Sequence, residues 1–249
     1  MRKLVVILFL AFSYLSFAEN IPEFNAANIL YNTGQYSKAI EAYKAIVDKG
    51  TVSSNLYLNL GNSYFKLNKI ADAIINYERA IKLSPSDEDI IFNLKVANTK
   101  IVDKIDPAPK FFITEWIDNV MGVFTSGGWG WLVVLSFWIA AGLFLTVLFV
   151  FKGQMKRIVF VASIAFVFLA IGFWVIAFTK YSAETNNNFG VIYNESVYVK
   201  ASPDEKSTDL FILHEGTKSE ILNTLNEWVQ IKLQNGNVGW IAINDIVRI

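Results

Sequence analysis

The sequence predicts a multi-domain membrane protein with three parts: an all-α repeat array, a two-helix transmembrane hairpin and an all-β barrel. Three observations support this prediction. Related residues recur at a spacing of 34 in the first part, as between Ala39 and Ala73. Two later stretches, residues 131–151 and 158–178, contain no charged residue. Beyond them, residues 185–249 alternate apolar and polar side chains over short segments, as β-strands do.

The two uncharged stretches are each 21 residues long and rich in Leu, Ile, Val and Phe. A helix of this length covers a hydrocarbon core roughly 30 Å thick. We therefore predict a transmembrane helix at 131–151 and another at 158–178. The alternative is a pair of helices buried in a soluble core, but the rest of the 249-residue chain does not supply enough surrounding protein.

The first residues have the pattern of a secretory signal peptide. Arg2 and Lys3 precede a short apolar run, and small residues near its end suit cleavage between Ala18 and Glu19. An uncleaved amino-terminal anchor is the alternative. The chain contains no cysteine, which excludes a lipid-anchored amino terminus, disulfides, thiol catalysis and thiolate metal sites.

The segment between the two predicted spans, residues 152–157, sets the expected topology. It carries Lys152, Lys156 and Arg157 and no acidic residue. Cytoplasmic loops are enriched in such cations. A signal peptide would carry the following segment out of the cytoplasm and so predicts the same orientation. We expect a cytoplasmic loop with both soluble parts on the opposite side of the membrane.

The first soluble part, residues 19–105, contains the repeat. We expect a first copy at about 20–53, a second at about 54–87 and a capping helix at 88–105. This short array would gain from self-association or a partner, because each unit buries its apolar face only against neighbours. The second copy resembles the tetratricopeptide repeat at the positions that define it: Tyr57, Leu60, Gly61, Tyr64, Ala73, Tyr77, Ala80 and Pro85.

In tetratricopeptide arrays the first helices of successive units line a groove that binds peptides, and the resemblance implies such a groove here. Asparagine amides suit it, since each can both donate to and accept from a peptide backbone. Alternatively, the asparagines only follow the repeat pattern. The balanced charge of this part argues against nucleic acid as a ligand. The candidate groove residues are Phe24, Asn25, Asn28, Tyr31, Leu58, Asn59, Asn62, Phe65, Phe92 and Asn93.

Residues 106–130 are expected to form a linker and an interfacial segment. Two prolines come first, an amphipathic stretch follows, and three glycines are expected to mark a break before the first span. The apolar side chains of this stretch are predicted to lie at the membrane surface. Packing against the spans is an equally good alternative. These side chains are Phe111, Phe112, Trp116, Val120 and Phe124.

The last part, residues 185–249, predicts a small barrel of short strands with an Asn-Gly hairpin turn at 235–236. The order of "VYVK", "LHEGT", "EWV" and "GWI" resembles a bacterial SH3-type domain. The resemblance implies recognition of cell wall or peptide, or alternatively only packing against a neighbouring domain. The candidate binding residues are Tyr198, Trp228 and Trp240.

The sequence shows no pattern typical of an enzyme, a cofactor site or a metal site. His214 is the only histidine, and a lone histidine is expected to be a structural or surface residue and not a ligand or general base. There is no glycine-rich phosphate loop, nucleophile elbow or carboxylate cluster at metal-binding spacing. Neither predicted span contains an ionisable residue, which argues against a transport path.

The full order of parts, together with residues 197–222, resembles the BatE-type proteins of the Bacteroides aerotolerance gene cluster. The resemblance implies a bacterial inner-membrane protein with both soluble domains in the periplasm. It implies a scaffold beside membrane proteins that carry von Willebrand type A domains, linked to envelope or oxidative stress tolerance. A protein that binds or senses peptidoglycan through the SH3-type domain is the alternative.

Overall fold

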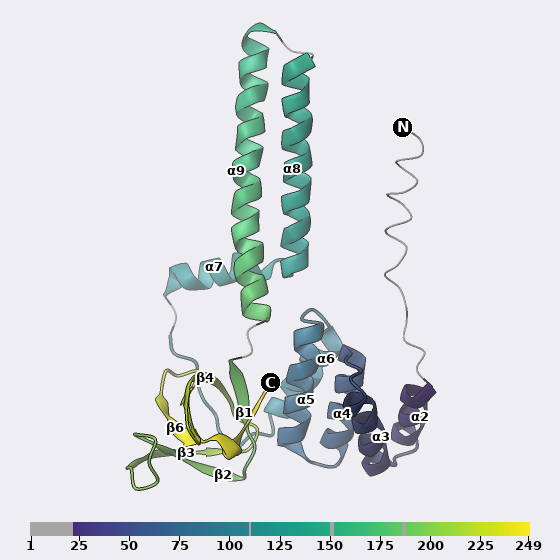
Figure 1. The fold of residues 1–249 in the computed structure, drawn as a ribbon, viewed down its shortest axis with the longest axis vertical. Coiled ribbons are helices and arrows are strands. Elements are labelled where there is room, and N and C mark those ends of the chain that lie inside the picture. Colours follow the sequence, from purple (N-terminus) through teal and green to yellow (C-terminus); the bar gives the residue numbers. More distant parts are fainter. Residues whose placement is uncertain (1–21, 110, 150–151, 186–187) are drawn as a thin grey trace.

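The computed structural model describes residues 22–109, 111–149, 152–185 and 188–249. A long helical hairpin stands above a soluble body in which the helical array and the β-domain lie side by side (Figure 1). The predicted architecture of an all-α array, two long apolar helices and an all-β domain is confirmed. The predicted cleavage site between Ala18 and Glu19 lies outside the described residues.

The array consists of paired antiparallel helices. Each pair turns through a residue in the left-handed region, Gly34 at φ 77° in the first and Asn68 at φ 59° in the second. Glycine and asparagine are the residues that adopt this conformation most readily, so the same turn is built at the same repeat position. The helices are α2 (Pro22–Asn32), α3 (Tyr36–Asp48), α4 (Ser54–Lys66), α5 (Ile70–Leu83) and α6 (Glu88–Asn98).

Side-chain caps start two of these helices. The Ser53 hydroxyl accepts a hydrogen bond from the Leu56 amide at 3.2 Å, at the start of α4. The Asp87 carboxylate accepts from the amides of Asp89 and Ile90, at the start of α6. These caps satisfy amides that have no partner within the helix. After α6 the chain is extended rather than helical, so the helix covers only part of the expected capping segment.

The hairpin is formed by α8 (Ser126–Phe149) and α9 (Gly153–Glu184), and the short helix α7 (Phe112–Gly122) precedes it. The helix α8 begins before the first predicted span, and α9 extends beyond the second at both ends. The three glycines before residue 131 lie inside α8 and do not form a break, and Lys156 and Arg157 lie inside α9. The helical geometry continues here because no proline interrupts it.

Small side chains hold α8 and α9 together. Ser136, Ala140 and Ser163 are buried between them, and the Ser163 hydroxyl donates to the Ala140 carbonyl oxygen at 3.2 Å. Small and hydroxyl residues allow close approach of helices in lipid. Most of the larger apolar side chains point outward. Both helices are long and apolar enough to cross a membrane.

The β-domain is one antiparallel sheet with strand order β3-β2-β6-β5-β4-β1-β7. Its core comes from alternate residues, such as Val197 and Val199 on β2 and Val229 and Ile231 on β5. The turn between β5 and β6 contains Gly236 at φ 90°. The strands are β1 (Phe189–Ile192), β2 (Ser196–Lys200), β3 (Asp209–His214), β4 (Lys218–Leu225), β5 (Trp228–Lys232), β6 (Val238–Ala242) and β7 (Ile246–Arg248), with a short 3-10 helix, η1 (Ile243–Asp245), before β7.

Candidate functional site

The candidate groove residues of the array differ in exposure. Asn25 and Phe92 are exposed, and the other candidates are half-buried. Several of the half-buried candidates also pack on the core of the array, which explains their lower exposure. The residues that pack in this way are Phe24 and Tyr31 in the first repeat and Leu58 and Phe65 in the second.

Two of the predicted asparagines meet where the first repeat contacts the second. The Asn28 side-chain oxygen accepts hydrogen bonds from the Tyr43 hydroxyl at 2.6 Å and from the Asn59 amide nitrogen at 3.0 Å. Burial raises the pKa of Tyr43 to about 12, so its hydroxyl keeps the proton that it donates. These bonds join α2 to α3 within one repeat and to α4 of the next.

The same arrangement recurs 34 residues later. The Asn62 side-chain oxygen accepts from the Tyr77 hydroxyl at 2.8 Å and from the Asn93 amide nitrogen at 3.1 Å. Burial raises the pKa of Tyr77 as well. We call the two sets together the asparagine–tyrosine ladder: Asn28, Tyr43, Asn59, Asn62, Tyr77 and Asn93.

The ladder limits what the asparagines can offer a ligand. One polar atom of each of its four amides is engaged within the array. A bound peptide would have to use the other polar atom of each amide, or else break the ladder. The ladder therefore has a structural role, and the role of these asparagines in peptide binding stays a prediction.

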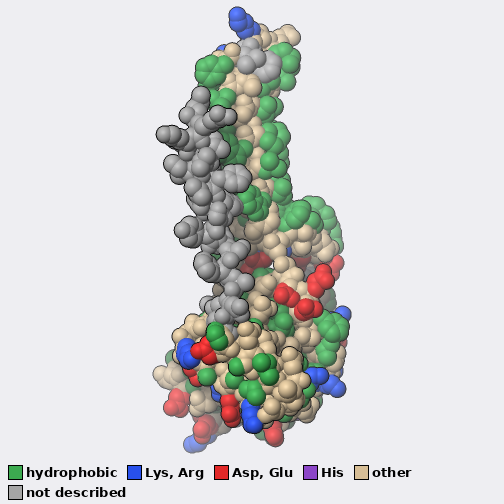
Figure 2. Space-filling model, turned by 90° about the vertical axis from the view of Figure 1, so that its right-hand side faces the viewer, with side chains coloured by type: hydrophobic (Ala, Val, Ile, Leu, Met, Phe, Trp, Pro, Cys, Tyr) green, Lys and Arg blue, Asp and Glu red, His purple; other side chains and the backbone are tan. Residues whose placement is uncertain are grey.

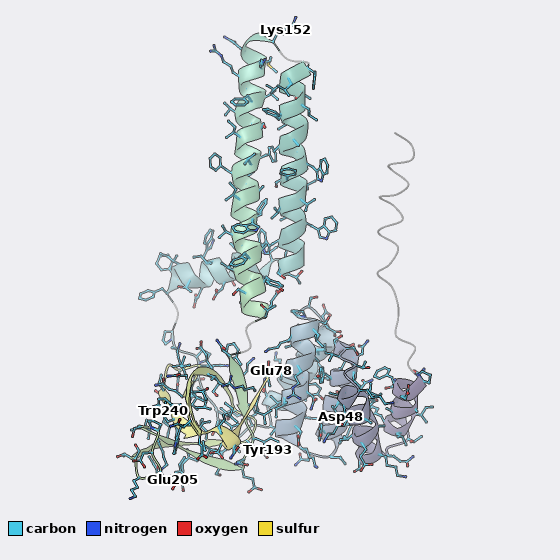
Figure 3. All side chains as sticks on the ribbon, in the orientation of Figure 1. Asp48, Glu78, Lys152, Tyr193, Glu205 and Trp240 are labelled. Carbon is cyan, nitrogen blue, oxygen red and sulfur yellow. The ribbon has the colours of Figure 1, made fainter. Side chains whose placement is uncertain are left out.

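The β-domain packs on α5, the second helix of the second repeat. Ile74 of α5 is fully buried in a cluster that includes Val191 of β1 and Ile249. Beside this cluster the Lys218 ammonium lies 2.7 Å from the Glu78 carboxylate, whose side chain is only 6% exposed. The β-domain therefore covers the outer face of α5, and Figure 3 shows Glu78 at this junction.

A second polar contact joins the segment after α6 to the β-domain. The Asp103 carboxylate accepts from the His214 amide at 2.7 Å and from the Thr217 hydroxyl at 2.6 Å, and it lies 2.7 Å from His214 Nδ1. Burial opposes ionisation of Asp103, but the hydrogen bonds from Thr217 and His214 outweigh it and lower its pKa. Asp103, His214 and Thr217 therefore form a structural link between the segment after α6 and the β-domain.

Sequence reasoning predicted a structural or surface role for His214 but missed its partner. Asp103 and His214 are 111 residues apart, and Asp103 lies in a segment with no regular secondary structure. No local pattern marks such a carboxylate. Among the described residues, no group of three or more His, Asp or Glu side chains is placed to hold a metal ion.

The three aromatic candidates of the β-domain share one face. Trp240 of β6 is paired with Lys200 of β2 and with Gln230 of β5. Paired residues, and residues two apart on one strand, point to the same side of a sheet. Tyr198 and Trp228 therefore lie on the same side as Trp240, opposite the core. Tyr198 is 56% exposed, and both tryptophans are half-buried.

The three candidate topology residues lie at the end of the hairpin remote from the soluble body, where Figure 3 labels Lys152. Lys152 precedes α9, and Lys156 and Arg157 lie in its first turns. All three are exposed. The cations are therefore separated from both soluble domains by the full length of the apolar helices.

Comparison with known families assigns the two soluble domains. Residues 24–48 and 54–87 each match a family model of the tetratricopeptide repeat, and residues 195–246 match that of the bacterial SH3 domain. No curated protein matches the chain. Both kinds of domain are generally non-catalytic interaction modules, and they suggest binding to proteins and to the cell wall, respectively.

Proposed function

We propose that this chain is a membrane-anchored extracytoplasmic scaffold whose tetratricopeptide array binds a segment of a neighbouring membrane protein. One observation carries the proposal. On the side of the array formed by the second helices of the repeats, α5 is covered by the β-domain. The side formed by the first helices still exposes Phe92 (65%) and Asn25. The open face is the one that binds peptides in this kind of repeat.

The proposed anchor is the α8–α9 hairpin, in the inner membrane of a bacterium with both soluble domains in the periplasm. The cluster of cations at the far end of the hairpin supports this orientation, because cytoplasmic loops are enriched in Lys and Arg. The native chain has no cysteine, so single cysteines report topology cleanly. In spheroplasts an impermeant thiol reagent is expected to label Asp48→Cys and Glu205→Cys and to spare Gln154→Cys. Labelling of Gln154→Cys without labelling of Asp48→Cys and Glu205→Cys would contradict the proposed orientation.

The proposed partner follows from the resemblance to BatE-type proteins. It is a membrane protein with a von Willebrand type A domain, within a Bat-type complex that contributes to envelope or oxidative stress tolerance. Such a partner lies in the same membrane, so its loops and tails are at a high local concentration near the array. The scaffold has no catalytic role in this proposal and needs no cofactor.

Site-specific photo-crosslinking in cells tests the groove. A photo-reactive residue at Phe92 is expected to capture a membrane protein with a von Willebrand type A domain, identified by mass spectrometry. Lys44 is the matched control, because it is exposed on the second-helix face of the first repeat. Equal capture from positions 92 and 44, or capture from 44 alone, would show that the groove is not the binding surface.

A second function is supported by the aromatic face of the β-domain. We propose that Tyr198, Trp228 and Trp240 contact peptidoglycan, because exposed aromatic rings suit the apolar faces of sugars and the domain matches the bacterial SH3 family. Figure 3 shows Trp240 on the side of the β-domain away from the array, so the two binding surfaces do not compete.

Sedimentation with purified cell-wall sacculi tests this second function. Full-length protein in detergent is expected to co-sediment, and Tyr198→Ala is expected to lose most of the bound fraction. Leu222→Ala serves as control, since Leu222 is another exposed apolar residue of the same domain, outside the three-residue set. No retention of the native protein would remove the cell-wall proposal and leave the scaffold proposal intact.

A further inference from the structure

The helix α7 lies across the base of the hairpin, crosswise to α8 and α9 (Figure 1). Its apolar side chains are not used by the fold. Between 43% and 83% of the surface of each of these residues is exposed, although apolar residues of this size are usually buried: Phe111, Phe112, Ile113, Trp116 and Ile117. An exposed apolar surface of this kind marks a site of contact with a membrane or with another molecule.

The exposed apolar side chains within the helix, Phe112, Ile113, Trp116 and Ile117, form one face of it. They recur at spacings of three and four residues, whereas the polar residues Thr114, Glu115 and Asn119 occupy the opposite face. Figure 2 shows hydrophobic side chains at the base of the hairpin with acidic side chains beneath them, toward the soluble body. The amphipathic helix thus lies between the hairpin and the soluble domains.

Two hydrogen bonds fix the end of α7 to the hairpin. The Met121 carbonyl oxygen accepts from the Trp129 indole nitrogen at 3.2 Å and from the Lys180 ammonium at 2.9 Å. The ring of Phe124 packs edge-on against Trp129 at 5.4 Å, and Trp129 is buried. The corner between α7 and α8 is therefore a defined joint.

This joint sets the depth of α7 relative to a bilayer. Lys180 follows the last apolar residue of the second predicted span, Phe178, by two positions, which is about 3 Å along a helix. Its ammonium therefore lies close to the boundary between hydrocarbon and headgroups. Because that ammonium binds the end of α7, this end lies at the same level, and the crosswise orientation of α7 to the hairpin suits a helix that lies along the membrane plane (Figure 1).

We propose that α7 is an interfacial helix whose apolar face is buried in the lipid leaflet next to the soluble domains. Residues 112–122 contain acidic residues but no Lys or Arg, so the attraction comes from burial of apolar side chains and does not need anionic lipid. The soluble body would thereby be held in a fixed orientation to the membrane surface. This inference requires insertion of α8 and α9, but it requires neither proposed binding partner.

Spin labels on single cysteines test the proposal in the full chain, reconstituted in phosphatidylcholine nanodiscs. Ile113→Cys and Ile117→Cys probe the apolar face, and Glu115→Cys and Asn119→Cys probe the polar face of the same helix. All four residues are exposed in the protein alone, so the substitutions disturb no core. Leu135→Cys, exposed on α8, is the control for insertion.

The labels at 113 and 117 are expected to collide readily with oxygen, which concentrates in lipid, and little with a water-soluble nickel chelate. Those at 115 and 119 are expected to show the opposite pattern. Equal access of the chelate to all four positions would overturn the proposal. Protection of 113 and 117 from both reagents would also overturn it, in favour of a protein contact. Access of the chelate to Leu135→Cys would instead overturn insertion of the hairpin, and the interfacial helix with it.

Discussion

The helices α3 and α5 hold the same place in successive repeats, yet they have different surroundings. On the inner side they match, since Tyr43 and Tyr77 are both buried against their own first helix. On the outer side they diverge. Lys44 of α3 is exposed, whereas Glu78 of α5, 34 residues later, is buried and paired with Lys218 of the β-domain.

This difference shows which positions a repeat determines and which it does not. The inner positions are set by packing within the 34-residue unit, so they carry the repeat pattern. The outer positions are set by whatever lies next to the unit. For α5 the neighbour is the β-domain, whose Lys218 is 140 residues away from Glu78 in the sequence.

The largest expected effect concerns the inner side, at the small residue of the first helix. A Cβ atom added at Gly61 would lie 2.7 Å from the Tyr77 ring and 3.2 Å from the Ala73 carbonyl oxygen. Gly61→Ala is therefore expected to destabilise the second repeat by about 3 kcal/mol. The measurement is urea unfolding of the full chain in detergent, followed by hydrogen exchange of α5 amides.

The first repeat provides the matched control, because it has Ala27 at the same position, fully buried without a clash. Ala27→Gly is expected to cost only about 1 kcal/mol, mainly through helix propensity. If Gly61→Ala lowers the stability no more than Ala27→Gly does, the two repeats pack more alike than the structure shows.

The second prediction concerns the outer side, where the two helices differ. Lys218→Met leaves the Glu78 carboxylate buried without its partner and removes the contact of the ammonium with the Phe189 ring. We expect a loss of about 2.5 kcal/mol, below the usual range for a broken buried pair because Lys218 is itself partly exposed. Hydrogen exchange at the α5–β1 contact provides the measurement.

Lys44→Met is the corresponding substitution on α3, and it is expected to change stability by less than about 0.5 kcal/mol because its side chain faces solvent. Glu78→Gln combined with Lys218→Met should recover part of the loss, since no charge then remains buried. Comparable effects of Lys44→Met and Lys218→Met would remove the distinction between the two outer faces.

The third prediction uses pH to weaken the contact of Asp103 with His214 and Thr217 of the β-domain. The pKa of Asp103 lies below its ordinary value of 3.8, so its ionised form stabilises the folded state. This contribution is complete well above 3.8 and is lost as the pH falls through the lowered pKa. Asp103→Asn is expected to cost about 2 kcal/mol at neutral pH. The difference between variant and native protein should shrink at acid pH.

Urea midpoints of the full chain between pH 7 and pH 2.5 give this comparison, with Asp106→Asn as the control in the same segment. Asp106 is exposed, and no effect on the domain contact is expected from it. A difference between Asp103→Asn and the native protein that stays constant down to the lowest pH would mean that the carboxylate is not the group that matters.

The contrast between inner and outer faces also explains what the sequence could predict. The repeats, the spans and the alternating strands follow local periodicities, so their positions were predictable from residues close together in the chain. The contacts of Glu78 and Asp103 with the β-domain were not predictable, because each joins residues more than a hundred positions apart. The asparagines were recognised as candidate groove residues, but their bonds to one another depend on the distance between helices, which the spacing alone does not give.

The smallest expected effect concerns the asparagine–tyrosine ladder, in which the two repeats are alike. Tyr43→Phe and Tyr77→Phe each remove one hydrogen bond to an asparagine and leave the ring in place. Each is expected to cost about 1 kcal/mol, with similar values because the bond recurs at the same repeat position. In a double-mutant cycle, Asn28→Ala should couple to Tyr43→Phe and not to Tyr77→Phe. Since the hydroxyls lie between helices and not on the open face, crosslinking from Phe92 should persist in both variants. Loss of capture in Tyr43→Phe or Tyr77→Phe at a temperature where the array stays folded would show that the ladder itself belongs to the binding surface.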